Sequence, residues 1–280
     1  MNLRVVAASV LLIVAGSVSG AAASGHGPVF GAATPTLGRG GWSVDQAWTY
    51  RVGEDVAGQQ MFKTMVSFGI TETVQVSASV PIAMSDGLGP ARMMSAMSSE
   101  REFEALVAYR FQRRTVGIGG RQESTLYVGG TAPMESTRAG ASVGPSLVVQ
   151  AATGYASRAH YAWAGGGVQH FAERHGDQQA ASRFLTLVYG YRPAPLRTEP
   201  GKPDLRFFVE ATAEDRSATK AHGAEVRSGE RTVFVGPTSL LLYKALAIEG
   251  GALFPVYQRD GQVRERVRVA INVAYFFWLD

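Results

Sequence analysis

Cysteine is absent from the sequence, so neither a disulfide framework nor a cysteine-linked lipid anchor is possible. Its absence is compatible with an exported, oxidising compartment but is not specific to one. Lysine is also rare, occurring only at positions 63, 202, 220 and 244, so arginine supplies most of the positive charge behind the formal net charge of +4. The arginines are scattered rather than clustered among aromatic residues, which argues against a nucleic-acid partner.

Signatures of nucleotide-binding and hydrolytic enzymes are missing as well. No phosphate loop, dinucleotide fingerprint or Gly-x-Ser-x-Gly elbow occurs, and Gly165–Gly167 lies in a strand-like run. Ser157 and His160 are close in sequence, but at strand spacing they face opposite sides. We therefore predict no enzyme, no catalytic residues and no cofactor. An outer-membrane lipid hydrolase stays the least favoured alternative.

Two groups of potential metal ligands lack the patterns of known sites. The histidines are His26, His160, His170, His175 and His222, and a methionine group comprises Met84, Met93, Met94 and Met97. His160 and His170 would lie about 33 Å apart on one strand, too far to share an ion. Methionines without a Met-x-Met array or cysteine more often fill gaps than bind copper. We predict no metal site, and leave metal handling as an open alternative.

Long hydrophobic runs are absent beyond the N-terminus. Arg4 precedes an apolar stretch, Val5–Val18, and small residues follow at 21–23. This pattern predicts a signal peptide over residues 1–23, with Ser24 as the alternative last residue. The apolar stretch is shorter than the roughly 20 residues that a membrane-spanning helix needs.

The C-terminal region contains a long strand with two different faces. From Val263 to Phe277 the odd positions are apolar except Glu265, whereas the even positions are mainly arginine, asparagine or alanine. Because side chains alternate across a strand, one face avoids water and the other accepts it. A tilted membrane-spanning strand needs about 9–11 residues, against about 5–6 in an average strand. This strand favours a β-barrel in an outer membrane.

Similar alternation recurs along the chain and predicts an all-β fold. The expected strands are 42–52, 66–70, 74–80, 103–111, 123–132, 142–153, 160–171, 181–191, 204–213, 230–243, 245–257 and 262–277. They form a single antiparallel transmembrane β-barrel of about twelve strands over residues 41–280. A periplasmic sandwich would show outer faces rich in lysine and glutamate, which this chain lacks.

The lengths of the links agree with such a barrel. The links near 71–73, 154–159 and 244 are short, whereas 53–63, 85–101 and 214–229 are longer and polar. Outer-membrane barrels have short periplasmic turns, longer outside loops and an even number of strands. Both termini are then periplasmic. The links 192–203 and 259–262 are exceptions, one long for a turn and one short for an outside loop.

A set of polar side chains is predicted to line the interior. They are Arg264, Arg266, Arg268, Asn272, Glu249, Glu102, Glu104, Arg110, Arg206 and Glu210. Arginines paired with carboxylates tolerate partial burial, so these residues form either a polar path or a network that stiffens or plugs the barrel. A lumen of about twelve strands exceeds the roughly eight-stranded barrel that side chains fill. The N-terminal segment 24–40, rich in glycine and proline, is therefore a candidate plug.

Short motifs resemble a known family. They are residues 26–35 and Gly38–Trp42, the hairpin Phe68–Val76 with the following Val80-Pro81, and the closing Asn272–Phe277. These resemble the outer-membrane proteins of the meta-pathway phenol-degradation family. The resemblance implies an exported barrel that passes small, often hydrophobic compounds, and it implies no catalytic or ligand-binding residue.

The function predicted is a channel or transporter in the outer membrane of a Gram-negative cell. Its solute would be small and hydrophobic or aromatic. The partners expected are outer-membrane lipid, that solute and the outer-membrane insertion machinery. The competing class is an exported β-protein without transport activity, such as a periplasmic binding or metal-handling module.

Overall fold

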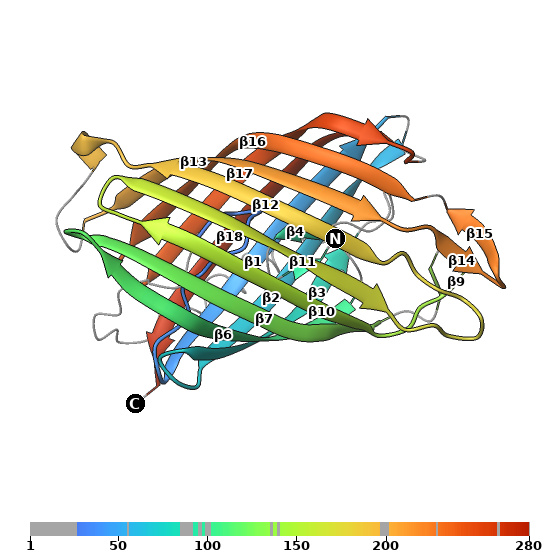
Figure 1. Ribbon diagram of the computed structural model, residues 1–280, viewed down its shortest axis with the longest axis horizontal. Coiled ribbons are helices and arrows are strands. Elements are labelled where there is room, and N and C mark those ends of the chain that lie inside the picture. The colour runs from blue at the N-terminus through green and yellow to red at the C-terminus, as the bar shows by residue number, and fades with distance from the viewer. Residues whose placement is uncertain are drawn as a thin grey trace, which may run out of the picture.

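Twelve long strands form one closed antiparallel barrel (Figure 1). The computed structural model describes residues 27–54, 56–84, 92–94, 97–98, 102–134, 137–138, 141–196, 202–227, 229–261 and 264–279. Each long strand pairs with its neighbours in sequence, and β1 (Gly41–Gly53) pairs with β18 (Glu265–Trp278) to close the barrel. The prediction of an all-β, twelve-stranded barrel is confirmed.

The other strands of the wall follow the predicted order. They are β2 (Val56–Gly69), β3 (Val74–Met84), β6 (Glu102–Val116), β7 (Gly120–Pro133), β10 (Ser146–Ala156), β11 (His160–Phe171), β12 (Ser182–Tyr191), β13 (Asp204–Arg216), β16 (Glu230–Tyr243) and β17 (Leu246–Arg259). Their lengths exceed those of average strands and fit a tilted membrane-spanning wall.

The two ends of the barrel differ in their connections. One end carries three short ribbons, β4–β5 (Arg92–Met94, Met97–Ser98), β8–β9 (Thr137–Arg138, Ala141–Ser142) and β14–β15 (Thr219–Ala221, Ala224–Arg227). The other end has tight turns, and one longer link holds the 3-10 turn η1 (Ala194–Leu196). Among the described residues, no helix is long and apolar enough to cross a membrane.

Alternation along each strand separates an apolar outer face from a mixed inner face. In β12 the outward Leu185 and Leu187 are 65% and 61% exposed, whereas the inward Phe184 and Val188 are buried. Apolar side chains exposed in a continuous band are stable only where lipid or protein covers them. The outer face is therefore suited to a bilayer.

One predicted link is wrong. The stretch 53–63 was expected to be a long polar loop, but β2 already begins at Val56 and pairs with β1 up to Gly53. Polarity misled this assignment because Gln59 and Lys63 are polar residues buried on the inner face of the wall. The predicted short turns after β2, β10 and β16 are present.

Candidate functional site

The N-terminal segment, residues 27–38, lies inside the barrel. Val29 and Phe30 are almost completely buried. The backbone N–H groups of Val29, Phe30 and Gly31 donate hydrogen bonds of 2.8, 2.9 and 2.8 Å to the Glu210 carboxylate. Thr238 donates a fourth, of 2.6 Å. A carboxylate that accepts several such bonds is well satisfied despite its burial, so Glu210 of β13 anchors the segment.

Other inward side chains hold the segment along its length. Tyr127 and Thr125 of β7 donate to the carbonyl oxygens of Ala33 and Thr34, each at 2.5 Å, and the Leu37 N–H donates to Gln75 of β3 at 2.8 Å. Gly165 on β11 leaves the space for this path, because a Cβ there would lie 2.9 Å from the Ala32 Cβ. The segment is thus bonded to several strands, but it belongs to none.

The segment packs against two apolar clusters on the inner wall. Val29 and Phe30 contact the cluster around Phe234 and Leu253. Leu37 packs nearer the end with the tight turns, in a cluster that comprises Tyr161, Trp163, Val188, Phe208, Leu240, Ala247, Ala274 and Phe276. The guanidinium of Arg206 lies 4.9 Å from the centre of the Tyr161 ring. The side of this half that β11, β12 and β13 form is therefore largely apolar and aromatic.

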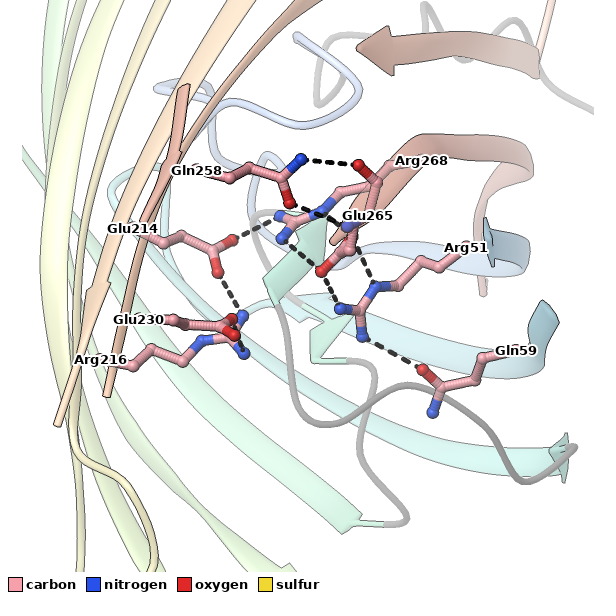
Figure 2. Close-up of polar contacts among 8 residues, drawn as sticks. All are labelled: Arg51, Gln59, Glu214, Arg216, Glu230, Gln258, Glu265 and Arg268. Carbon is pink, nitrogen blue, oxygen red and sulfur yellow. Dashed lines mark hydrogen bonds and ion pairs between the residues drawn. The ribbon is translucent and has the colours of Figure 1, made fainter. Parts of the chain in front are cut away.

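A buried ion network crosses the lumen near the opposite end (Figure 2). Arg268 contacts Glu265 at 2.9 Å and reaches Glu214 of β13 at 2.7 Å. Arg51 forms an ion pair with Glu265, and Arg216 forms one with Glu214. Arg216 also contacts Glu230 at 2.9 Å.

The network is balanced in charge and crosses the interior. Its arginines are Arg51, Arg216 and Arg268, and its carboxylates are Glu214, Glu230 and Glu265. Arg268 and Glu214 belong to β18 and β13, which are not adjacent in the barrel. Gln59 and Gln258 provide further bonds, to Arg51 and to the backbone of Glu265.

Phe234 lies between the ion network and the N-terminal segment. Its ring centre is 4.0 Å from the Arg268 guanidinium carbon, and it shares an apolar cluster with Val29 and Phe30. A guanidinium over an aromatic face is a favourable contact when both are desolvated. The ion network and the N-terminal segment thus both contact Phe234.

Most residues predicted to line the interior do lie on the inner face. Arg268, Asn272, Glu249, Glu102, Glu104, Arg110 and Glu210 are buried there, and Arg206 is partly buried. Asn272 donates to Asp45 at 3.1 Å and to Glu249 at 2.9 Å. Arg110 bonds Glu123 at 3.2 Å. Whether these side chains border a path for a solute remains a prediction.

Arg264 and Arg266 do not lie beside Arg268 on the inner face, and their prediction is wrong. The register between β1 and β18 shifts at Val52/Gly53, where Gly53 pairs with Glu265. Strict alternation therefore fails at this point. Glu265 is buried inside, whereas Arg264 is exposed and Arg266 points away, 65% exposed and 3.9 Å from Glu54.

Several residues of the network were missed from the sequence. Glu214 and Arg216 fell in a predicted loop, because the strand was expected to end at residue 213 rather than at Arg216. Arg51 had a usable signal, since it alternates with Thr49 and Asp45 on the polar face of β1. Glu265 had no such signal, because a bulge in β18 turns its side chain to the inner face, against the alternation of the strand.

The loops beyond the ion network are tied to one carboxylate. Asp177, between β11 and β12, accepts hydrogen bonds of 2.7 Å from the backbone N–H groups of Ser142 and His222. These bonds, that from Ser142 first, lower the pKa of Asp177 to about 2. A single side chain thus joins three links between strands.

The histidines occupy separate positions. His160 Nδ1 lies 2.9 Å from the Tyr189 hydroxyl, and Ser157 contacts the backbone of His160 rather than its ring. His170, His175 and His222 are exposed. Within the described residues, no group of three or more His, Asp or Glu could hold a metal ion. The signal peptide, His26 and the side chains of Met84, Met93, Met94 and Met97 lie outside what the structure describes.

Comparison with known proteins places the fold. The chain resembles the COG4313 outer membrane channel from Pseudomonas putida F1, with a TM-score of 0.65 and 11% identity, over 89% of this chain and 100% of that one. At such identity the likeness shows a shared barrel fold. Two further structures are too distant to support an argument. OccAB4 of Acinetobacter baumannii has a TM-score of 0.40 and 8% identity, over 84% of this chain and 97% of that one. LpxR of Salmonella typhimurium has a TM-score of 0.38 and 11% identity, over 85% of this chain and 100% of that one. No family model and no curated protein matches the chain.

Proposed function

We propose that this protein is an outer-membrane channel for small apolar or aromatic compounds, exported by means of residues 1–23. The N-terminal segment acts as its plug. The observation that carries the proposal is a lumen filled by a segment that no strand pairing holds. Its backbone N–H groups donate to Glu210 and Gln75, and its carbonyl oxygens accept hydrogen bonds from Thr125 and Tyr127.

The lining of the tight-turn half favours an apolar solute. Tyr161 and Trp163 stack inside the barrel, and Phe208 meets the Tyr161 ring edge-on and the Trp163 ring at a tilt, with ring centres 5.7 to 6.1 Å apart. Leu37 of the segment lies in the same cluster. Displacement of Leu37 would expose a surface that an aromatic compound can cover, whereas a sugar would leave polar groups unpaired there.

Deleting residues 27–37 and measuring single-channel conductance in planar bilayers tests the plug. We expect the deletion to raise conductance several-fold, because the remaining lumen of a twelve-stranded barrel is wider than side chains alone fill. The heat-modifiable gel shift shows whether the variant still forms a barrel. Unchanged conductance through a correctly folded variant would refute the plug.

The rates at which different solutes cross the membrane of proteoliposomes test the solute class. We expect a small aromatic compound such as phenol to cross at a rate that increases with protein content, after subtraction of its flux through protein-free vesicles. A sugar of similar size should cross more slowly. Equal or faster passage of the sugar would leave a channel but contradict the solute class.

A further inference from the structure

A hollow of about 540 Å³ opens on the outer face of β10 to β13. Its rim is formed by the exposed side chains of Tyr155, Leu187, Tyr189 and Val209, and its floor includes Ala162 and Ala164. These exposed residues alternate with inward ones such as Trp163 and Val188, which also border the hollow. Because the rim side chains lie on the outer face, the hollow opens away from the lumen. Its shape and apolar lining suit hydrocarbon chains.

Two arginines adjoin this hollow, one at the end of a strand and one in a turn. Arg114 lies at the end of β6, opposite Gln122, which lines the hollow and pairs with Tyr155. Arg158 lies in the turn between β10 and β11, and its Cγ is 3.5 Å from where a Cβ of Gly119 would be. The ends of β6, β7 and β10 therefore bring both arginines to one edge of the hollow.

The positive charge on this edge is not balanced. Glu123 is the acidic residue nearest in sequence, but it is buried on the inner side and contacts Arg110, Arg113 and Arg121 at 3.2, 3.7 and 3.3 Å. Arg114 and Arg158 are exposed, and neither forms an ion pair with a residue that the structure describes. Two guanidinium groups are thus left to face an external anion.

We propose that this edge and the hollow bind one anionic phospholipid of the inner leaflet, with its phosphate on Arg114 and Arg158. Its acyl chains lie against Tyr155, Leu187 and Val209. The Tyr189 hydroxyl, paired with His160, marks the same boundary between headgroup and hydrocarbon. The inference rests on the proposed orientation, in which tight turns face the periplasm, but not on transport.

Native mass spectrometry of the full protein in detergent, with phosphatidylglycerol or phosphatidylethanolamine added, tests the site. We expect the protein to retain phosphatidylglycerol in preference, and the Arg114→Gln/Arg158→Gln variant to retain at least about tenfold less, since each basic residue at a lipid surface contributes about a fivefold preference. Ala164→Phe, which fills the hollow without changing charge, should also reduce retention.

A second hollow supplies the matched control. It lies towards the other end of the outer face, has a volume of about 560 Å³, and includes Arg183 and Arg231. Arg183→Gln/Arg231→Gln removes the same number of arginines there, where Arg231 already pairs with Asp215 at 3.2 Å, and should leave phosphatidylglycerol retention unchanged. Equal loss in both double variants, no loss in either, or equal retention of the two lipids would overturn the proposal. Conductance measured on the same samples separates this outcome from failure of the channel proposal.

Discussion

The two halves of the lumen contain different kinds of contact. Near the end with the short ribbons, charged side chains of the wall pair with one another, as Arg268 does with Glu214 and Glu265. Near the other end, a separate segment donates backbone N–H groups to side chains of the wall. In the first case the contacts lie within the wall, and in the second they join the wall to a separate piece of chain.

The physical consequence is a difference in what each half can release. Breaking the ion network leaves buried charges without partners, which is strongly unfavourable. Releasing the segment breaks hydrogen bonds between its neutral N–H groups and side chains of the wall. Water then takes the place of each partner and replaces most of the lost hydrogen bonds. The comparison predicts that the half with the ion network is rigid and that the half with the segment can move, with Phe234 in contact with both.

Removing Arg268 should have the largest effect. Arg268→Met leaves Glu214 and Glu265 without their shared partner, and we expect a loss of about 3–5 kcal/mol in the free energy of unfolding. The midpoint of urea unfolding, followed by gel mobility of unboiled samples, measures it.

The matched control lies two residues away on the same strand. Arg266→Met removes an exposed side chain and should change stability by less than about 1 kcal/mol. Similar losses in the two variants would contradict the assignment of a rigid half to Arg268.

Weakening the anchor of the segment should have a smaller effect on stability and a clear one on permeability. In Glu210→Gln an amide nitrogen replaces one carboxylate oxygen and faces N–H groups that need an acceptor. Each lost hydrogen bond to a charged group costs about 1.5–3 kcal/mol of stability. We expect more frequent channel openings and faster proteolysis within residues 27–37, with little change in barrel unfolding.

Glu123→Gln is the control for this prediction, because Glu123 is a buried carboxylate that forms ion pairs with arginines of the wall. If it increased proteolysis of the segment as much as Glu210→Gln does, the anchor would not be specific to Glu210.

The smallest effect is expected in the loops beyond the ion network. The depressed pKa of Asp177 means that its carboxylate stabilises the folded loops above about pH 4 and loses this effect as the pH falls towards about 2. Hydrogen exchange at the Ser142 and His222 amides should therefore increase over that interval, after correction for the intrinsic rate.

Asp177→Asn should show faster exchange already at neutral pH and little further dependence on acid. Conductance should change little, since the loops lie beyond the network. A wild-type response centred near neutral pH would point to a histidine instead.

Predictions from the sequence succeeded where a local rule repeats. Alternation in stretches such as 160–171 and 230–243 matches the bounds of β11 and β16, because each residue is sorted independently by whether it faces lipid or the interior. They failed where a single residue breaks the rule. The register shift opposite Gly53 turned Glu265 inward and Arg266 outward. Neither side chain has a property from which such a bulge could be predicted.

The amino-acid sequence by itself determined the all-β wall, its strand order and its two faces, because these follow from side-chain alternation and link lengths along the chain. Only the tertiary structure decided which polar residues meet. Arg268 and Glu214 are far apart in sequence and on strands that do not pair, and Glu210 finds its donors at residues 29–31 across the lumen. Closure of the barrel sets these distances, and closure is a property of all twelve strands together.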